Sequence, residues 1–169
     1  MADAGTTRLS SFDRMLLDEA VAQAEKSFAE GGIPIGAAIG APALGVVASG
    51  HNLRVQQGDA TAHGETACLR AAGRRRDWHT LTMATTLSPC VMCAGALLLH
   101  RVPRVIIGEH ENFMGEEALL RERGVELIVA HDATCLALMR RFIAEQPELW
   151  NEDIGVPGDD SGGDGEVVA

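Results

Sequence analysis

Short apolar runs alternate with segments of helical periodicity along most of this 169-residue chain, and that alternation restricts the folds open to it. Strands are typically about four to eight apolar residues long, whereas apolar residues spaced roughly three to four apart indicate helices. On these grounds we predict strands at residues 34–40, 44–50, 81–87, 104–108 and 125–130. Helices are predicted at residues 12–30, 63–72, 90–100, 115–123, 132–144 and 147–153, and a loop at 51–61.

The order of these elements is a helix, two strands and then helices alternating with strands. Alternation of this kind is typical of a sheet covered by helices on both faces. We therefore predict an α/β protein, a three-layer α/β/α sandwich with a central mixed sheet of about five strands. The domain is expected to span residues 12–155, after a flexible leader at 1–11 and before a disordered acidic tail at 156–169.

The chain is acidic, with a formal net charge of −10. The predicted tail holds four acidic residues and no Lys or Arg, which leaves a charge of about −6 on the rest. Acidic surfaces repel phosphate backbones, so a nucleic acid polymer is not an expected partner. No apolar run reaches the roughly 18 residues of a membrane helix, so no membrane partner is expected. Residues 1–10 lack the order of a signal peptide, and we expect a cytoplasmic protein.

Four cysteines are present, and only Cys90 and Cys93 lie close together in the sequence. Thiols of a cytoplasmic protein are normally reduced, so their spacing is more informative than any pairing. Cys68 and Cys135 fall in predicted helices and are interpreted as small buried apolar residues. Residues 94–99 are apolar nearly all round, and we expect them to be buried in the core or at a subunit interface.

Two short segments hold residues suited to metal-dependent chemistry. One contains His63 and Glu65, the other contains Cys90 and Cys93 directly after Pro89, and each opens a predicted helix. One imidazole and two thiolates form a good ligand set for a single Zn²⁺ ion. Three protein ligands leave one position for a water, whose pKa zinc lowers to about 7, with Glu65 as the proton carrier. A redox pair or half of a structural zinc site is the alternative for the two cysteines alone.

The order His-x-Glu followed by Pro-Cys-x-x-Cys is typical of zinc deaminases. The pattern resembles the cytidine-deaminase-like superfamily of zinc hydrolases, and over residues 12–155 the chain resembles fungal-type cytosine deaminases more closely. The most specific stretches are residues 30–36, 50–52, 60–65, 85–90 and 150–155. The last of these discriminates best, because the general superfamily pattern does not require it. Residues 74–80 form a shorter segment than in these relatives, and their three arginines are interpreted as a solvated loop.

The resemblance implies an activity, the hydrolytic deamination of a free nucleobase, with cytosine converted to uracil and ammonia. Glu65 would be the catalytic residue, and His63, Cys90 and Cys93 would be the zinc ligands. A substrate-binding set is also implied, comprising Ile33, Asn52, Gly64, Ser88, Phe113, Trp150 and Asp153. The glycine and the serine of this set would contribute polar contacts of their backbone. A homodimer is likewise implied.

The other members of the set are expected to hold a planar base. Asn52 would hydrogen-bond the pyrimidine edge, and Asp153 would accept the amino group that is removed. Phe113 and Trp150 would line and cover the pocket, with Ile33 beneath. Each role has a structural alternative. Asn52 could be a turn residue and Phe113 a core residue, and Trp150 and Asp153 could anchor the last helix.

Three other functions remain open at this point. The same zinc chemistry would serve a guanine-like base, isocytosine or a related heterocycle. A deaminase of adenosine in tRNA would need a basic face, against which the acidic composition argues. A zinc-stabilised binding module without activity is the third alternative, and it would be expected to have a fourth protein ligand.

Overall fold

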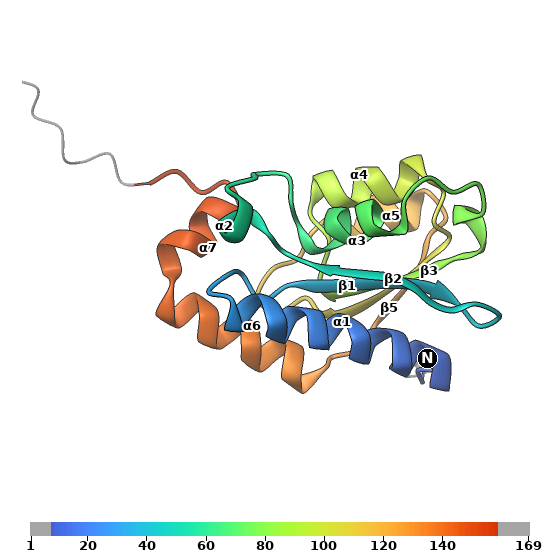
Figure 1. Ribbon diagram of the computed structural model, residues 1–169, viewed down its shortest axis with the longest axis horizontal. Helices are drawn as coiled ribbons and strands as arrows, with labels where there is room; N and C mark the ends of the chain where they lie inside the picture. Colours follow the sequence, from blue (N-terminus) through green and yellow to red (C-terminus); the bar gives the residue numbers. More distant parts are fainter. Residues whose placement is uncertain (1–7, 159–169) are drawn as a thin grey trace, which may run out of the picture.

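The computed structural model describes residues 8–158, in which one five-stranded sheet lies between two layers of helices (Figure 1). The predicted three-layer α/β/α sandwich is therefore confirmed. Residues 1–7 of the predicted leader and 159–169 of the predicted tail lie outside the described residues. No helix within residues 8–158 is both long enough and apolar enough to cross a membrane.

The elements follow the predicted order. The helices are α1 (Ser11–Ala29), α2 (Arg54–Gln57), α3 (Gly64–Ala72), α4 (Val91–Leu99), α5 (Glu117–Glu122), α6 (Ala133–Glu145) and α7 (Pro147–Asp153). The strands are β1 (Gly36–Ala41), β2 (Gly45–His51), β3 (Thr82–Leu87), β4 (Arg104–Glu109) and β5 (Glu126–Val129). The prediction of a loop at 51–61 is wrong at α2, a single helical turn that Gly58 ends with a left-handed φ of 62°. A 3₁₀ turn at Trp78–Thr80 was also not predicted.

The strands are ordered β2-β1-β3-β4-β5 across the sheet. Strand β1 pairs antiparallel with β2 and β3, whereas β3, β4 and β5 are parallel, so the sheet is mixed as predicted. Every residue of β1 and β3 is buried, as expected for strands covered on both faces. The parallel strands β3 and β4 end side by side at Leu87 and Glu109, and this end of the sheet carries the candidate site.

Neighbouring residues of the central strands face opposite helical layers. Met83 and Ile107 pack with the layer of α3, α4 and α5, whereas Ala84 and Ile106 pack with the layer of α1 and α6 (Figure 1). Asp132 caps α6, because its Oδ1 accepts hydrogen bonds from the backbone N–H groups of Thr134 and Cys135 in the first turn of that helix. The alternation of strand side chains thus fixes both layers to one sheet.

The apolar helix α4 is only partly buried. Cys93 and Leu97 face the core, but Val91 is 66% exposed and Leu99 is 78% exposed. The core alternative for residues 94–99 is therefore wrong for this face, because α4 lies in an outer layer and packs on one side only, and the alternative of a subunit interface stays a prediction. The other two cysteines, outside the candidate metal site, are buried as predicted.

Candidate active site

A pocket of about 480 Å³ lies beside the carboxyl end of β3. Most of its wall comes from four parts of the chain: the starts of α3 and α4, residues 113–116, and α7. The carboxyl ends of parallel strands are a common position for ligand sites in α/β proteins. Each of these walls contains at least one residue that the sequence motifs single out.

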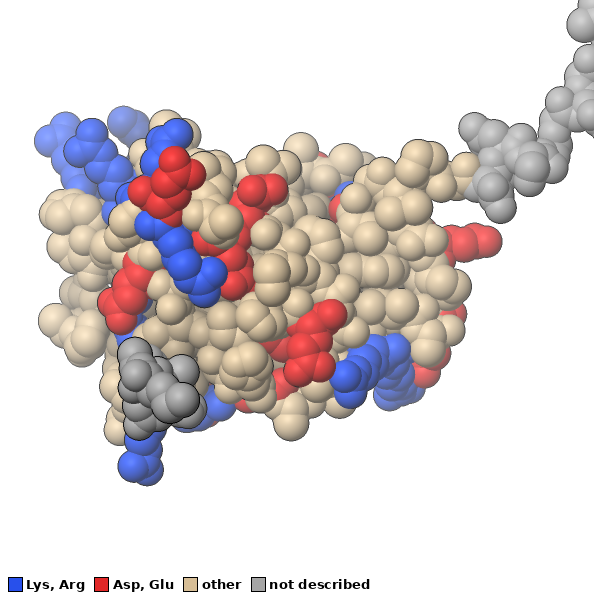
Figure 2. All heavy atoms as spheres, turned by 180° about the vertical axis from the view of Figure 1, so that it is seen from behind, with Lys and Arg blue, Asp and Glu red and all other residues tan. Residues whose placement is uncertain are grey.

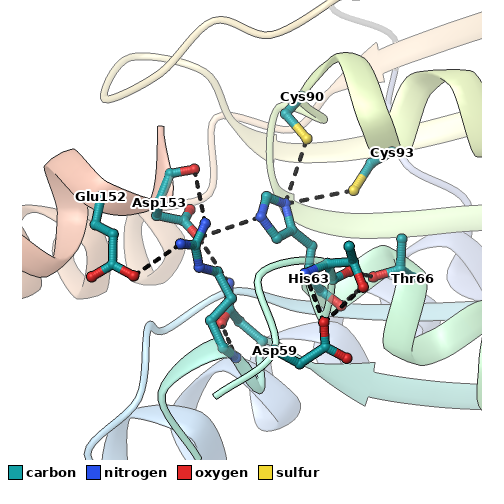
Figure 3. A network of polar contacts seen from close by, with 10 residues as sticks. Asp59, His63, Thr66, Cys90, Cys93, Glu152 and Asp153 are labelled. Carbon is teal, nitrogen blue, oxygen red and sulfur yellow. Dashed lines mark hydrogen bonds and ion pairs between the residues drawn. The ribbon is translucent and has the colours of Figure 1, made fainter. Parts of the chain in front are cut away.

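His63, Cys90 and Cys93 lie together at this pocket although they come from two helices. His63 is the N-cap residue of α3 and Cys90 is that of α4, both with extended backbone. Nδ1 of His63 lies 3.4 Å from Sγ of Cys90 and 3.8 Å from Sγ of Cys93 (Figure 3). A tetrahedral zinc ion holds nitrogen and sulfur ligands about 3.6 Å apart, so these atoms fit one Zn²⁺ ion. Within residues 8–158 they are the one group of metal-ligating side chains so close together.

The two thiols are coupled in a way that favours a cation. The hydrogen bond from Cys93, with a further one from His63, lowers the pKa of the Cys90 thiol to about 4. Pairing with Cys90 raises the pKa of Cys93, because a second thiolate beside the first is unfavourable. A bound divalent cation removes this conflict, since a coordinating thiol loses its proton. The chemistry of the donor set therefore fits zinc.

Glu65 reaches the same pocket from the first turn of α3 and is 3% exposed. Its Oε1 accepts a hydrogen bond of 2.9 Å from the Thr85 hydroxyl. Burial raises the pKa of the Glu65 carboxyl group, and the negative charge of Cys90 adds to the effect. Residues two apart on a regular helix point roughly 200° apart, but His63 precedes the first turn, so both side chains reach the pocket. Such a carboxyl group is suited to accept and return a proton.

Asp153 lines the pocket from α7 and joins residues that are distant in the sequence. Its Oδ1 lies 3.4 Å from Nε2 of His63 (Figure 3) and accepts a hydrogen bond of 3.3 Å from Nδ2 of Asn52. Nη1 of Arg54, which the sequence motifs did not single out, lies 3.5 Å from the same oxygen. Asn52 is fully buried, and it lies behind Asp153 instead of lining the pocket. Burial raises the pKa of Asp153, while the nearby His63 and Arg54 oppose this shift.

Two aromatic residues form the apolar part of the pocket. Phe113 comes from the segment before α5 and Trp150 from α7, and their rings meet edge to face with centroids 6.0 Å apart. Ile33 is 1% exposed and packs in the same apolar cluster as Trp150, beneath the wall. The pocket thus offers aromatic surfaces to a flat ring and polar groups to its edge.

The remaining predicted residues lie in different positions. Ser88 lines the pocket. Gly64 lies behind it, where α3 meets the chain before β1, and a Cβ atom there would come within 3.0 Å of the Ile35 carbonyl oxygen. Several lining residues were missed by the sequence reasoning: Ile35, Arg54, Ala60, Leu87, Val91, Met92, Met114, Gly115, Glu116 and Ile154. Ile35, Ala60, Leu87 and Ile154 lie within the stretches that carry the resemblance, but no role was assigned to them. Nearness to Asn52 was the one signal available for Arg54.

Comparison with known families identifies the metal-binding half of the site. A profile of the family described as cytidine and deoxycytidylate deaminase zinc-binding region matches residues 10–109. The matched region contains His63, Glu65, Cys90 and Cys93. The matched region ends before Phe113, Trp150 and Asp153. It therefore supports the fold and the metal ligands but says nothing about the pocket wall formed by α7.

Individual relatives extend the comparison. The cytosine deaminase of Candida albicans is 48% identical over 145 residues, which cover 85% of this chain and 97% of that protein. A tRNA-specific adenosine deaminase of Haemophilus influenzae is 38% identical over 109 residues, covering 63% of this chain and 62% of that protein. The solved guanine deaminase from Nitrosomonas europaea matches with a TM-score of 0.64 and 25% identity, over 81% of this chain and 86% of that one. The resemblance to fungal-type cytosine deaminases is confirmed by the first of these.

Proposed function

The chain belongs to the zinc-binding family of cytidine and deoxycytidylate deaminases, and from this premise we propose that it converts free cytosine to uracil and ammonia. It is a zinc-dependent hydrolytic deaminase, with one group of ligands for one ion per chain. The observation that supports cytosine as the substrate is the 48% identity to the Candida albicans cytosine deaminase along 97% of that protein. A match of this length necessarily includes His63, Glu65, Cys90 and Cys93.

Glu65 moves the protons of the reaction. When bound, zinc would supply a water of lowered pKa beside the base. The Glu65 carboxylate accepts a proton from the attacking water and donates it to N3 of the ring. As the water oxygen bonds to C4, Glu65 takes the second proton from that oxygen and passes it to the amino group. The bond between C4 and the amino nitrogen then breaks, so that ammonia leaves and uracil remains. The raised pKa of this buried carboxyl group suits both acceptance and donation.

The pocket residues orient the base in this proposal. Asp153 accepts a hydrogen bond from the amino group, and Arg54 beside it supports the ionised carboxylate. Asn52 acts on the same edge of the ring through Asp153, because its amide group donates a hydrogen bond to that carboxylate. Phe113 and Trp150 enclose the ring, above Ile33. The backbone at Ser88, which lines the pocket, supplies a further polar contact, and a second would come from the backbone at Gly64, between the lining residues His63 and Glu65.

A free base suits the surface as well as the pocket. A volume of about 480 Å³ is of the size that holds a small molecule. On the face seen in Figure 2, acidic side chains stand among the basic ones, and no continuous basic surface is present there. With a net charge of −10, the chain lacks the electrostatic attraction that tRNA binding needs.

We further propose a homodimer that works in the cytoplasm. The exposed apolar residues Val91 and Leu99 of α4, with Met114 at 63% exposure nearby in the pocket rim, form a face suited to a second copy. Zinc binding by Cys90 and Cys93 requires reduced thiols, which the cytoplasm maintains.

The deciding experiment is ammonia release by the zinc-loaded protein from a panel of free bases and nucleosides, with Glu65→Gln as the blank. We expect rapid turnover of cytosine and slow turnover of cytidine, because the relative that matches along 97% of its length is a cytosine deaminase. Turnover of guanine or isocytosine in place of cytosine would reject cytosine as the substrate and would leave the proposed zinc-dependent deamination standing. No turnover of any base would reject the enzyme.

A further inference from the structure

Glu117, the first residue of α5, is a buried carboxylate outside the proposed catalytic group. It is 3% exposed, and its Oε1 accepts hydrogen bonds of 2.9 Å from the Ser88 hydroxyl and 2.9 Å from Nδ1 of His110. Its Oε2 lies 3.2 Å from Nη1 of Arg121. Burial alone would raise the pKa of Glu117, but these donors outweigh burial and lower it. The carboxylate is therefore ionised at neutral pH and has a full set of partners.

Ser88 connects this carboxylate to the pocket wall. Its hydroxyl donates to Glu117 and accepts a hydrogen bond of 3.0 Å from the backbone N–H of Gly115. The backbone N–H of Glu116 donates to the carbonyl oxygen of Pro89 at 3.0 Å. A Cβ atom on Gly115 would come 1.9 Å from that same oxygen, so only glycine permits this approach. The pocket-lining segment is thus held directly against the start of α4.

The segment held in this way forms one wall of the pocket. Phe113 and Met114 line the pocket, and the Phe113 ring meets that of Trp150. The other end of the segment is shaped by Glu109, which is 1% exposed and accepts hydrogen bonds from the backbone of Glu111 at 2.7 Å. Two buried carboxylates thus hold the segment that carries Phe113, Glu109 at its start and Glu117, through Ser88, at its end. The position of the Phe113 wall therefore depends on these few contacts.

We propose that Glu117 is a positioning residue that acts through Ser88 to hold the Phe113 wall where it encloses the substrate ring. This inference rests on the proposed function, since its effect is exerted on the base in the pocket. Glu117 itself does not line the pocket, so its influence passes through the serine hydroxyl. The expected signature is weaker substrate binding with the proton chemistry of Glu65 unimpaired.

The experiment compares full-length, zinc-loaded protein with Ser88→Ala, Glu117→Gln, the double variant and Glu122→Gln. Glu122 is an exposed glutamate on the same helix and provides the matched control. We expect KM for cytosine to rise about tenfold in each of the first two variants, with kcat within about twofold. The double variant is expected to match Ser88→Ala, because Glu117 has no route to the Phe113 wall once the Ser88 hydroxyl is gone. Glu122→Gln is expected to behave as the parent, and zinc content is expected to be full throughout.

Three results would overturn the proposal. They are an unchanged KM in Glu117→Gln, effects of the two single changes that multiply in the double variant, and loss of zinc from Glu117→Gln. If Glu117→Gln fails to fold, the milder Ser88→Ala variant decides, with its KM and with amide hydrogen exchange of residues 111–116. Faster exchange there than in the parent supports the positioning role, and equal exchange rejects it. A parent inactive on cytosine would reject the proposed function alone, because hydrogen exchange reads the linkage without turnover.

Discussion

Oδ1 of Asp153 lies 3.4 Å from Nε2 of His63, so the last described helix contacts the ring whose Nδ1 faces the two cysteines. A carboxylate beside the second nitrogen of a metal-binding histidine fixes the orientation and tautomer of the ring. Helix α7 therefore bears on the metal site as well as on the pocket. The geometry of this pair leads to the first of five predictions.

Replacing Asp153 by Asn is expected to weaken zinc binding by about 10–100-fold, because the neutral amide no longer orients His63 as the carboxylate does. Competition with a chromophoric chelator measures this change. Glu152→Gln is the control, since that neighbouring side chain is 68% exposed and forms its ion pair with Arg54 and not with His63. Equal zinc affinity in Asp153→Asn and the parent would contradict the prediction.

Glu65→Gln is expected to retain zinc and lose activity by roughly 10²–10⁴-fold, the usual contribution of a positioned proton carrier. The amide can still accept the hydrogen bond from Thr85, so the fold is expected to persist. Ammonia release and metal analysis of the same sample check both parts. Near-normal turnover with zinc present would exclude Glu65 from proton transfer.

Cys93→Ala is expected to lower zinc content, because it removes one of three ligand atoms from the site. Metal analysis after dialysis against buffer free of zinc provides the measurement. Cys68→Ala is the matched control, since Cys68 is also buried but lies outside the ligand group. Equal zinc loss in both variants would point to general destabilisation.

Stability is expected to decline in acid through the pair of Asp13 and Arg104. The hydrogen bond from Arg104 lowers the pKa of Asp13, which is 3% exposed and ties α1 to β4. A lowered folded-state pKa means that this stabilisation is present above the ordinary pKa of an aspartate and is lost as pH falls through the folded value. Asp13→Asn is expected to cost roughly 1–3 kcal/mol at pH 7 and less near pH 3. Denaturant unfolding at both pH values tests this, and an equal cost at both would refute it.

Leu99→Glu is expected to convert the proposed dimer into a monomer, because it places a charge in the exposed apolar face of α4. Light scattering after size-exclusion chromatography reports the mass. Leu44→Glu is the control, since Leu44 is 55% exposed in the turn between β1 and β2. A parent that is already monomeric would reject the dimer itself.

Much of the fold was predictable because it depends on local pattern. The periodicity of residues 12–30 predicted α1, and the apolar runs predicted all five strands. In the three central strands, β1, β3 and β4, burial on both faces selects such runs. Helix α2 was missed because a single turn has too few residues for periodicity. The exposed face of α4 was missed because apolar composition records no direction, and the solvent side follows from which neighbours pack against the helix.

The zinc ligands were predictable from local order. Cys90 and Cys93 are three residues apart at the start of α4, a spacing that lets both thiols face one point, and His63 directly precedes α3. Assembly of the pocket is different in kind. Asp153 beside His63, Arg54 beside Asp153, and Glu117 beneath Ser88 are contacts between residues far apart in the chain. No spacing rule relates such residues, since their distances depend on how the layers pack on the sheet. Local sequence order therefore determined the helices, the strands and the choice of zinc ligands. Tertiary packing alone determined which side chains surround those ligands.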